Sequence, residues 1–149
     1  MAKQKIIPYL MFNGQAEEAM NYYISICGGS INFLTKYGEN KEHLPHPISE
    51  EELDRVIHAQ FTLMGNSLYC SDRAGENQVF EQGNSISLTI ECESEEEIER
   101  LYVELAKNGK IFMPLQDTFW NAKYAVFADK YGITWQLDYA KDRCQPSGE

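Results

Sequence analysis

One order of predicted elements occurs twice along this chain of 149 residues. In each half, a strand, a helix and three further strands follow one another, as the spacing of the apolar residues indicates. The predicted strands lie at about 6–12, 30–38, 55–64 and 67–72 in the first half, and at about 85–92, 110–116, 124–128 and 134–139 in the second. The repeat predicts an α+β fold built from two βαβββ modules.

The two predicted helices begin and end at equivalent places in the repeat. Asn13 or Gly14 is expected to cap the first helix, and Ser94 caps the second as the first residue of a Ser-x-x-Glu capping box. Gly29 and Gly109 are expected to stop the helices. The starts Asn13 and Ser94 lie 81 residues apart and the glycine stops lie 80 apart, which supports the two-module interpretation.

The predicted domain is a single one made of both modules. Module 1 covers about 5–72, a linker covers 73–83, module 2 covers about 84–139, and a polar tail covers 140–149. An acidic, proline-containing segment at 39–54 has loop composition and is predicted to be an insertion in the first module.

Composition excludes several classes of partner. The formal charge of −10 would repel a phosphate backbone, so we expect no nucleic-acid partner. No apolar run approaches the roughly 20 residues that span a bilayer, and the first acidic residues follow too soon for a signal peptide. The four cysteines form no Cys-x-x-Cys motif. We therefore expect a cytoplasmic protein with reduced thiols and no membrane contact.

Strict alternation assigns faces to several strands. In the last strand, Trp135 and Leu137 point to one side and Gln136 to the other. The third strand places His58 and Gln60 on its polar side, and the fifth is expected to do the same with its serines, Ser85 and Ser87. A polar face of this kind meets either water or a ligand.

Ordered strings along the chain resemble one protein family. They include Pro8-Tyr9-Leu10, Phe12-Asn13-Gly14-Gln15-Ala16-Glu17-Glu18-Ala19, His58-Ala59-Gln60-Phe61, Phe119-Trp120, Asp129-Lys130-Tyr131-Gly132 and Trp135-Gln136. Together they are similar to the PhnB-like branch, also called demethylubiquinone methyltransferase-like, of the vicinal oxygen chelate superfamily. That superfamily includes glyoxalase I, bleomycin-resistance proteins and extradiol dioxygenases. The resemblance covers about residues 5 to 139.

The resemblance implies two modules that curl into an incomplete barrel around a cleft. In the metalloenzymes of the superfamily, four side chains line the cleft and bind the metal. The matching positions here are Pro8, Cys70 or Ser71, Ser85 and Gln136. Proline has no ligating atom and serine is a poor ligand, so we expect no metal. A Gly-rich nucleotide loop is absent from the sequence, so we also expect no cofactor and find no support for methyl transfer.

Two polar residues are candidates for chemistry in such a cleft. His58 is the acid–base candidate because its charge changes near neutral pH, although a hydrogen-bonded structural histidine would fit the same position. Asp72 could orient His58 or bind a hydroxyl group of a ligand, or it could cap the turn that follows it.

Aromatic and histidine pairs give two further alternatives. Trp120 and Tyr124 could stack on a planar ligand at the mouth of the cleft, or they could fill a corner of the core. His43 and His46, in the insertion, have a His-x-x-His spacing that suggests a metal, but no predicted regular structure brings the rings together.

The sequence is therefore compatible with three alternative functions. The first is a metal-free protein that binds a small organic molecule; the second is a lyase or isomerase that acts next to a carbonyl with His58 as base. The third is a homodimeric module with a vestigial cleft, since superfamily members commonly pair. The predicted ligand-binding residues are His58, Gln60, Asp72, Ser85, Ser87, Trp120, Tyr124 and Gln136.

Overall fold

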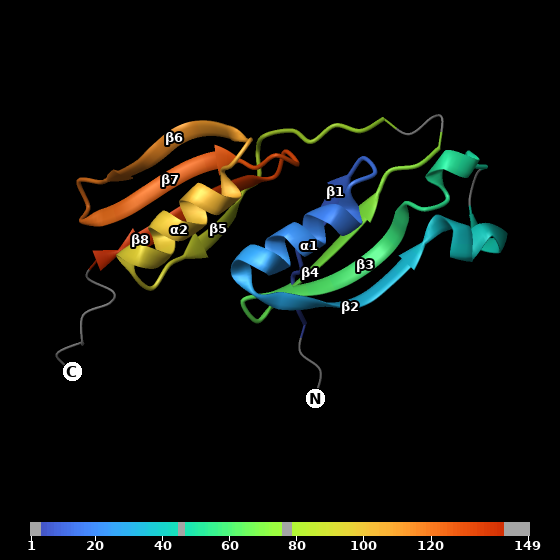
Figure 1. Ribbon diagram of the computed structural model, residues 1–149, viewed down its shortest axis with the longest axis horizontal. Coiled ribbons are helices and arrows are strands. Elements are labelled where there is room, and N and C mark those ends of the chain that lie inside the picture. The colour runs from blue at the N-terminus through green and yellow to red at the C-terminus, as the bar shows by residue number, and fades with distance from the viewer. Residues whose placement is uncertain (1–3, 45–46, 76–78, 142–149) are drawn as a thin grey trace. The chain divides into compact units, whose positions relative to one another are not determined.

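The chain divides into two compact units with the same architecture. A computed structural model describes residues 4–44, 47–75 and 79–141. The units are Met1–Glu81 and Gln82–Glu149, and each contains one α-helix and one mixed four-stranded sheet (Figure 1). The prediction of an α+β fold with two βαβββ modules is confirmed.

The first unit is built around the sheet β1-β4-β3-β2. The parallel pair β1–β4 closes this sheet on one side, and the pairs β4–β3 and β3–β2 are antiparallel. The segment between β2 and β3, predicted as a loop, contains two short 3₁₀ helices. The elements are β1 (Tyr9–Phe12), α1 (Ala16–Cys27), β2 (Gly29–Lys36), η1 (Tyr37–His43), η2 (Glu50–Glu52), β3 (Val56–Leu63) and β4 (Asn66–Asp72).

The second unit repeats this topology without the insertion. Its sheet has the order β5-β8-β7-β6, with β5 and β8 parallel and the other pairs antiparallel (Figure 1). The elements are β5 (Leu88–Glu91), α2 (Glu95–Leu105), β6 (Lys110–Asp117), β7 (Ala122–Ala128) and β8 (Thr134–Ala140).

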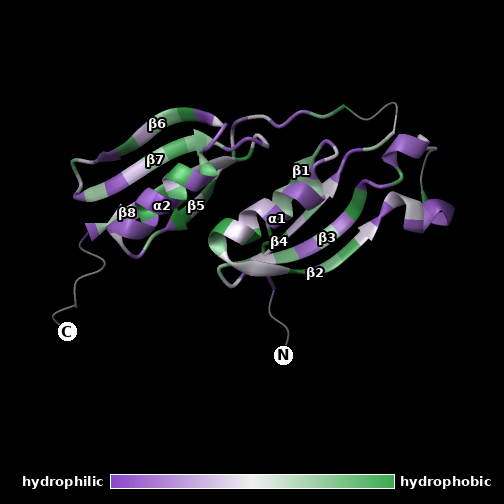
Figure 2. Cartoon of the chain, in the orientation of Figure 1, coloured by the Kyte–Doolittle hydropathy of each residue, from purple (hydrophilic) through white to green (hydrophobic). Residues whose placement is uncertain are grey.

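The core of each unit lies between its helix and one face of its sheet. In the first unit, Met20 and Tyr23 of α1 are fully buried, as is Phe61 on β3. In the second, Leu101 of α2 and Phe127 of β7 are equally buried. Figure 2 shows bands of both hydropathy colours along β3, as expected for a strand with one apolar and one polar side.

The start of α1 differs from the prediction. Neither Asn13 nor Gly14 caps the helix, and the residue at the N-cap position, Gln15, makes no capping bond with its side chain. Asp72 of β4 accepts hydrogen bonds from the backbone nitrogens of Gly14 and Ala16 instead, at 2.8 and 2.9 Å. A buried carboxylate from another strand thus binds the first N–H group of the helix, at Ala16, and the N–H group of Gly14 just before the N-cap.

The start of α2 agrees with the prediction. The Ser94 hydroxyl accepts from the Glu97 backbone nitrogen at 3.0 Å, as in a capping box. The Glu97 carboxylate, however, accepts from the backbone nitrogen of Glu93, one residue before the cap, at 2.8 Å.

Two strand boundaries need correction. The hairpin between β3 and β4 turns at Met64-Gly65, not at Gly65-Asn66, because Leu63 pairs with Asn66. Both turn residues have positive φ, +50° and +79°, as a two-residue hairpin turn requires. The predicted strand 85–92 is shorter: β5 starts at Leu88, which pairs with Trp135 near the beginning of β8, so the residues before it have no strand partner.

Two equivalent glycines are fixed by close backbone contacts. A Cβ atom at Gly29 would lie 1.7 Å from the carbonyl oxygen of Thr62, and one at Gly109 would lie 2.0 Å from that of Ala128. Only glycine fits where the chain enters β2 and β6. Neither glycine ends a helix, because the C-caps are Gly28 for α1 and Ala106 for α2. The glycines predicted as helix stops serve the strand pairing instead.

Candidate ligand-binding site

The predicted faces of β3 and β8 are those seen in the structure. Ala59 and Phe61 are buried beneath α1, while His58 and Gln60 are partly exposed on the other side of β3. On β8, Trp135 is buried and Gln136 is partly exposed. His58 and Gln60 in the first unit, and Gln136 in the second, thus lie on the sheet face that the helix of their own unit does not cover.

The first group of side chains on such a face is the His58 cluster, formed by Tyr9, Phe33, His58, Gln60 and Tyr69. The Tyr9 hydroxyl lies 2.9 Å from Nδ1 of His58, and the Gln60 amide nitrogen lies 3.2 Å from Nε2. The rings of Tyr9, Tyr69 and Phe33 have centroids 5.6, 5.3 and 6.2 Å from that of His58. His58 is therefore hydrogen-bonded at both ring nitrogens and flanked by aromatic rings.

Tyr9 was missed by the sequence analysis. Leu10 is 9% exposed on the helix side of β1, which puts Tyr9 on the opposite side, the side of His58. Pro8, which the resemblance placed at the first metal position, precedes β1 and has the parity of Leu10. Tyr9 therefore lies on the side of the sheet that carries His58, and Pro8 does not.

The second group is the Gln136 cluster, formed by Ser87, Trp120, Tyr124 and Gln136. The Gln136 amide nitrogen donates to the Ser87 hydroxyl at 3.0 Å, and the Tyr124 hydroxyl donates to the amide oxygen of Gln136. The Trp120 ring centroid lies 6.0 Å from that of Tyr124. Trp120 is 52% exposed in the turn before β7, so it does not fill a corner of the core.

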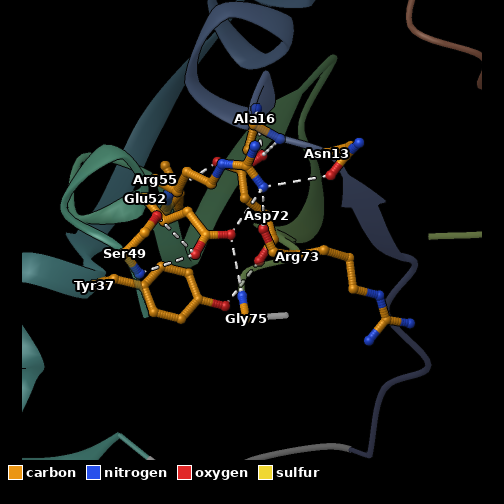
Figure 3. A network of polar contacts seen from close by, with 11 residues as sticks. Asn13, Ala16, Tyr37, Ser49, Glu52, Arg55, Asp72, Arg73 and Gly75 are labelled. Carbon is orange, nitrogen blue, oxygen red and sulfur yellow. Dashed lines mark hydrogen bonds and ion pairs between the residues drawn. The ribbon is translucent and has the colours of Figure 1, made fainter. Parts of the chain in front are cut away.

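Two predicted site residues lie elsewhere. Ser85 is exposed and precedes β5, so it has no place on the strand face assigned to it. Asp72 is only 2% exposed and binds the backbone: besides the two nitrogens at the start of α1, its Oδ2 accepts from the Val56 nitrogen at 2.9 Å (Figure 3). Asp72 joins α1, β3 and β4, and three N–H groups occupy its oxygens.

A polar network around Asp72 holds the insertion to the first unit (Figure 3). The Glu52 carboxylate accepts from the backbone nitrogen of Gly75 at 3.1 Å and from that of Ser49 at 3.2 Å, and these bonds lower the pKa of Glu52. Arg55 donates to the Arg73 carbonyl oxygen at 2.6 Å. Sequence reasoning treated this segment as a plain loop and did not find the network.

The part of the chain that the structure describes contains no cluster of side chains that could bind a metal ion. Among residues 4–44, 47–75 and 79–141, no three His, Cys, Asp or Glu side chains are grouped to hold an ion. Of the His-x-x-His pair, His43 ends η1 and His46 lies outside the described residues. Cys70 is buried, and burial raises the pKa of its thiol to about 12, with the Asp72 charge adding to the effect.

Comparison with known proteins finds a matching protein family and several similar proteins. The sequence model described as 3-demethylubiquinone-9 3-methyltransferase matches residues 4–138. The chain belongs to this family. The PhnB protein from Bacillus cereus, described as a putative 3-demethylubiquinone-9 3-methyltransferase, is 40% identical, with a TM-score of 0.75 over 92% of this chain and 100% of that one. The protein YjdN of Escherichia coli is 27% identical over 91% of this chain and 95% of its own.

More distant structures share the fold alone. A glyoxylase/bleomycin resistance protein/dioxygenase domain from Frankia has a TM-score of 0.63 with 14% identity, covering 95% of both chains. The predicted resemblance to the PhnB-like proteins is thus confirmed, and the fold is one that the glyoxylase/bleomycin resistance protein/dioxygenase domain shares. In addition, none of the helices among the described residues is long and apolar enough to cross a membrane.

Proposed function

We propose that this protein binds a small, uncharged organic molecule without a metal ion. The observation that carries the proposal is that each unit combines amide and hydroxyl groups with half-exposed aromatic rings on the side of its sheet away from its helix, and the first unit adds the His58 imidazole. Such a combination suits a planar ligand, because rings supply contact area and a few polar groups fix its orientation.

The charge distribution favours an uncharged ligand. Neither the His58 cluster nor the Gln136 cluster contains an Asp, Glu, Lys or Arg side chain, and the ion pairs found among the described residues all involve other side chains. The net charge of −10 adds a general repulsion of anions.

The hydrogen bonds of His58 favour binding over the alternative of a lyase or isomerase. A general base needs a nitrogen within reach of the proton that it removes. Both nitrogens of His58 already face neighbours, Tyr9 on one side and Gln60 on the other. A substrate would have to displace one of them before His58 could act.

Native mass spectrometry of freshly purified protein tests the proposal. We expect a species heavier than the chain by the mass of an organic molecule, and loss of that species in His58→Ala and Gln136→Ala. Thermal melts with Zn²⁺, Ni²⁺, Mn²⁺ and Fe²⁺ serve as the second arm. Stoichiometric metal, or a melting temperature several degrees higher with one ion, would contradict metal-free binding.

Homodimer formation in the cytoplasm is the second part of the proposal. Support comes from β6, an edge strand on which three successive apolar residues, Ile111, Phe112 and Met113, are exposed. Exposed apolar patches of this kind commonly mark interfaces. Sedimentation at micromolar concentration is expected to give twice the 17.1 kDa chain mass. A monomer would refute pairing, and a dimer that carries no small molecule would favour the vestigial module.

A further inference from the structure

We propose that Tyr9 is the ligand-contacting residue of the His58 cluster, and that it donates its phenolic proton to the carbonyl oxygen of a planar aromatic ketone. His58 is then a positioning residue that acts through Tyr9. This inference rests on the proposed function and adds the donor, its direction and the ligand class.

The direction of the hydrogen bonds follows from Gln60. Its amide nitrogen lies 3.2 Å from Nε2 of His58 and can only donate, so Nε2 must accept. A neutral imidazole with an accepting Nε2 carries its proton on Nδ1. The Nδ1–H group therefore donates to the Tyr9 oxygen, 2.9 Å away.

Because the Tyr9 hydroxyl oxygen accepts the hydrogen bond from His58, its own O–H group can donate to another partner. Tyr9 is 46% exposed on the helix-free face, so this proton points to a place that a ligand can reach. The chain Gln60 to His58 to Tyr9 thus ends in one donor, and each bond of the chain polarises the next.

The surroundings select the acceptor. Rings of Phe33 and Tyr69 flank His58, with Phe33 49% exposed, so a flat molecule finds contact area beside the donor. None of the five residues of the His58 cluster is a lysine or arginine that would balance the charge of a carboxylate. A neutral carbonyl group on an aromatic ring meets both conditions.

The ligand test measures the affinity of the full-length protein for 4-hydroxyacetophenone by NMR titration. Two comparison ligands are titrated in the same way: 4-ethylphenol, which has no carbonyl group, and 4-hydroxybenzoate, which has a carboxylate in place of the ketone. We expect the ketone to bind wild-type protein more tightly than either, and Tyr9→Phe to weaken it on the order of fivefold, the effect of one neutral hydrogen bond. The matched control Tyr102→Phe removes a hydroxyl group from α2 of the second unit, outside the His58 cluster, and should leave affinity unchanged.

A second test addresses His58 without any ligand. Two-bond ¹H–¹⁵N spectra distinguish the protonated from the bare ring nitrogen, and the His58 signals are those missing from His58→Asn. Wild-type protein should show the proton on Nδ1. Gln60→Glu places an acceptor at Nε2, so the proton of the neutral ring should move there. The Tyr9 hydroxyl should then donate to the bare Nδ1, and the affinity for the ketone should fall as much as in Tyr9→Phe.

Each result decides the proposal. A proton on Nε2 in wild-type protein, or equal affinity of the ketone for wild-type and Tyr9→Phe, would overturn the assignment of Tyr9. No binding of the ketone to wild-type protein would overturn the ligand class, while a co-purified molecule in native mass spectra would leave the proposed function standing.

Discussion

The indole nitrogen of Trp135 donates a 2.8 Å hydrogen bond to Oδ2 of Asp129, and both side chains are buried. The other oxygen of Asp129 accepts from the backbone nitrogens of Tyr131 and Ile133 at 2.8 and 3.1 Å. One carboxylate thus fixes the turn before β8 and the inward side chain of that strand. Because successive residues of a strand point to opposite faces, it also fixes Gln136 outward.

Trp135→Ala and Gln136→Ala are expected to differ strongly in stability. The first empties a buried site and removes the donor to Asp129, so it should cost about 3–5 kcal/mol. The second removes bonds that water can replace at a partly exposed position and should cost about 0.5–1 kcal/mol. Denaturant unfolding measures both. Equal losses would contradict the face assignment of β8.

Asp72→Asn is expected to destabilise the first unit. An amide has one acceptor oxygen where the carboxylate has two, so at least one of the three bound N–H groups loses its partner, at a cost of about 1–3 kcal/mol. Asp54→Asn is the matched control, since its side chain is 89% exposed in a surface ion pair and should change stability little. Chemical denaturation of both variants makes the comparison.

Cys70 is expected to resist alkylation in the folded protein. Thiol reagents attack the thiolate, and a pKa of about 12 keeps this group protonated at pH 8. Cys27 is partly exposed and should react before Cys70 and Cys92, the two buried thiols among the described residues. Peptide mapping after brief treatment with iodoacetamide locates the label, and unfolded protein provides full labelling as the control.

The same thiol gives stability a dependence on alkaline pH. Because the folded pKa lies above the ordinary value of 9.0, the unfolded state ionises first. The contribution of Cys70 is therefore complete below about pH 9 and is lost as pH rises towards about 12. Cys70→Ala should flatten this part of the profile of unfolding free energy against pH; an unchanged slope would contradict the assignment.

Gly29→Ala is expected to cost more than Gly65→Ala. Both glycines have positive φ, but a Cβ at Gly29 would collide with the Thr62 carbonyl oxygen, whereas nothing lies within 4 Å of one at Gly65. The difference should exceed about 1 kcal/mol, because strain alone accounts for the second variant. Similar melting temperatures for the two variants would show that β2 can move away from β3.

Strands with alternating composition could be interpreted from the sequence alone. In β3 and β8 polar and apolar residues alternate, so the faces of His58 and Gln136 were predicted, and the structure agrees. β1 is apolar throughout, so its pattern does not show which of Tyr9 and Leu10 faces the helix. For that reason Tyr9 was found only in the structure.

Long-range contacts account for the other differences. The three donors to Asp72 come from residues 14, 16 and 56, and no local pattern brings them together. The start of β5 depends on where β8 begins, almost 50 residues later, so Ser85 was assigned to a strand that does not include it. Composition alone cannot locate such partners.

The parallel pairing of β1 with β4 sets a condition on the order of folding. Tyr9 pairs with Tyr69, sixty positions later, while the β3–β4 hairpin closes over a two-residue turn. Hairpins form in microseconds, but a strand whose partner is distant in sequence must pay the entropy of closing the whole intervening loop. During synthesis, β1 therefore leaves the ribosome before its partner strand and stays unpaired until β4 has been synthesised.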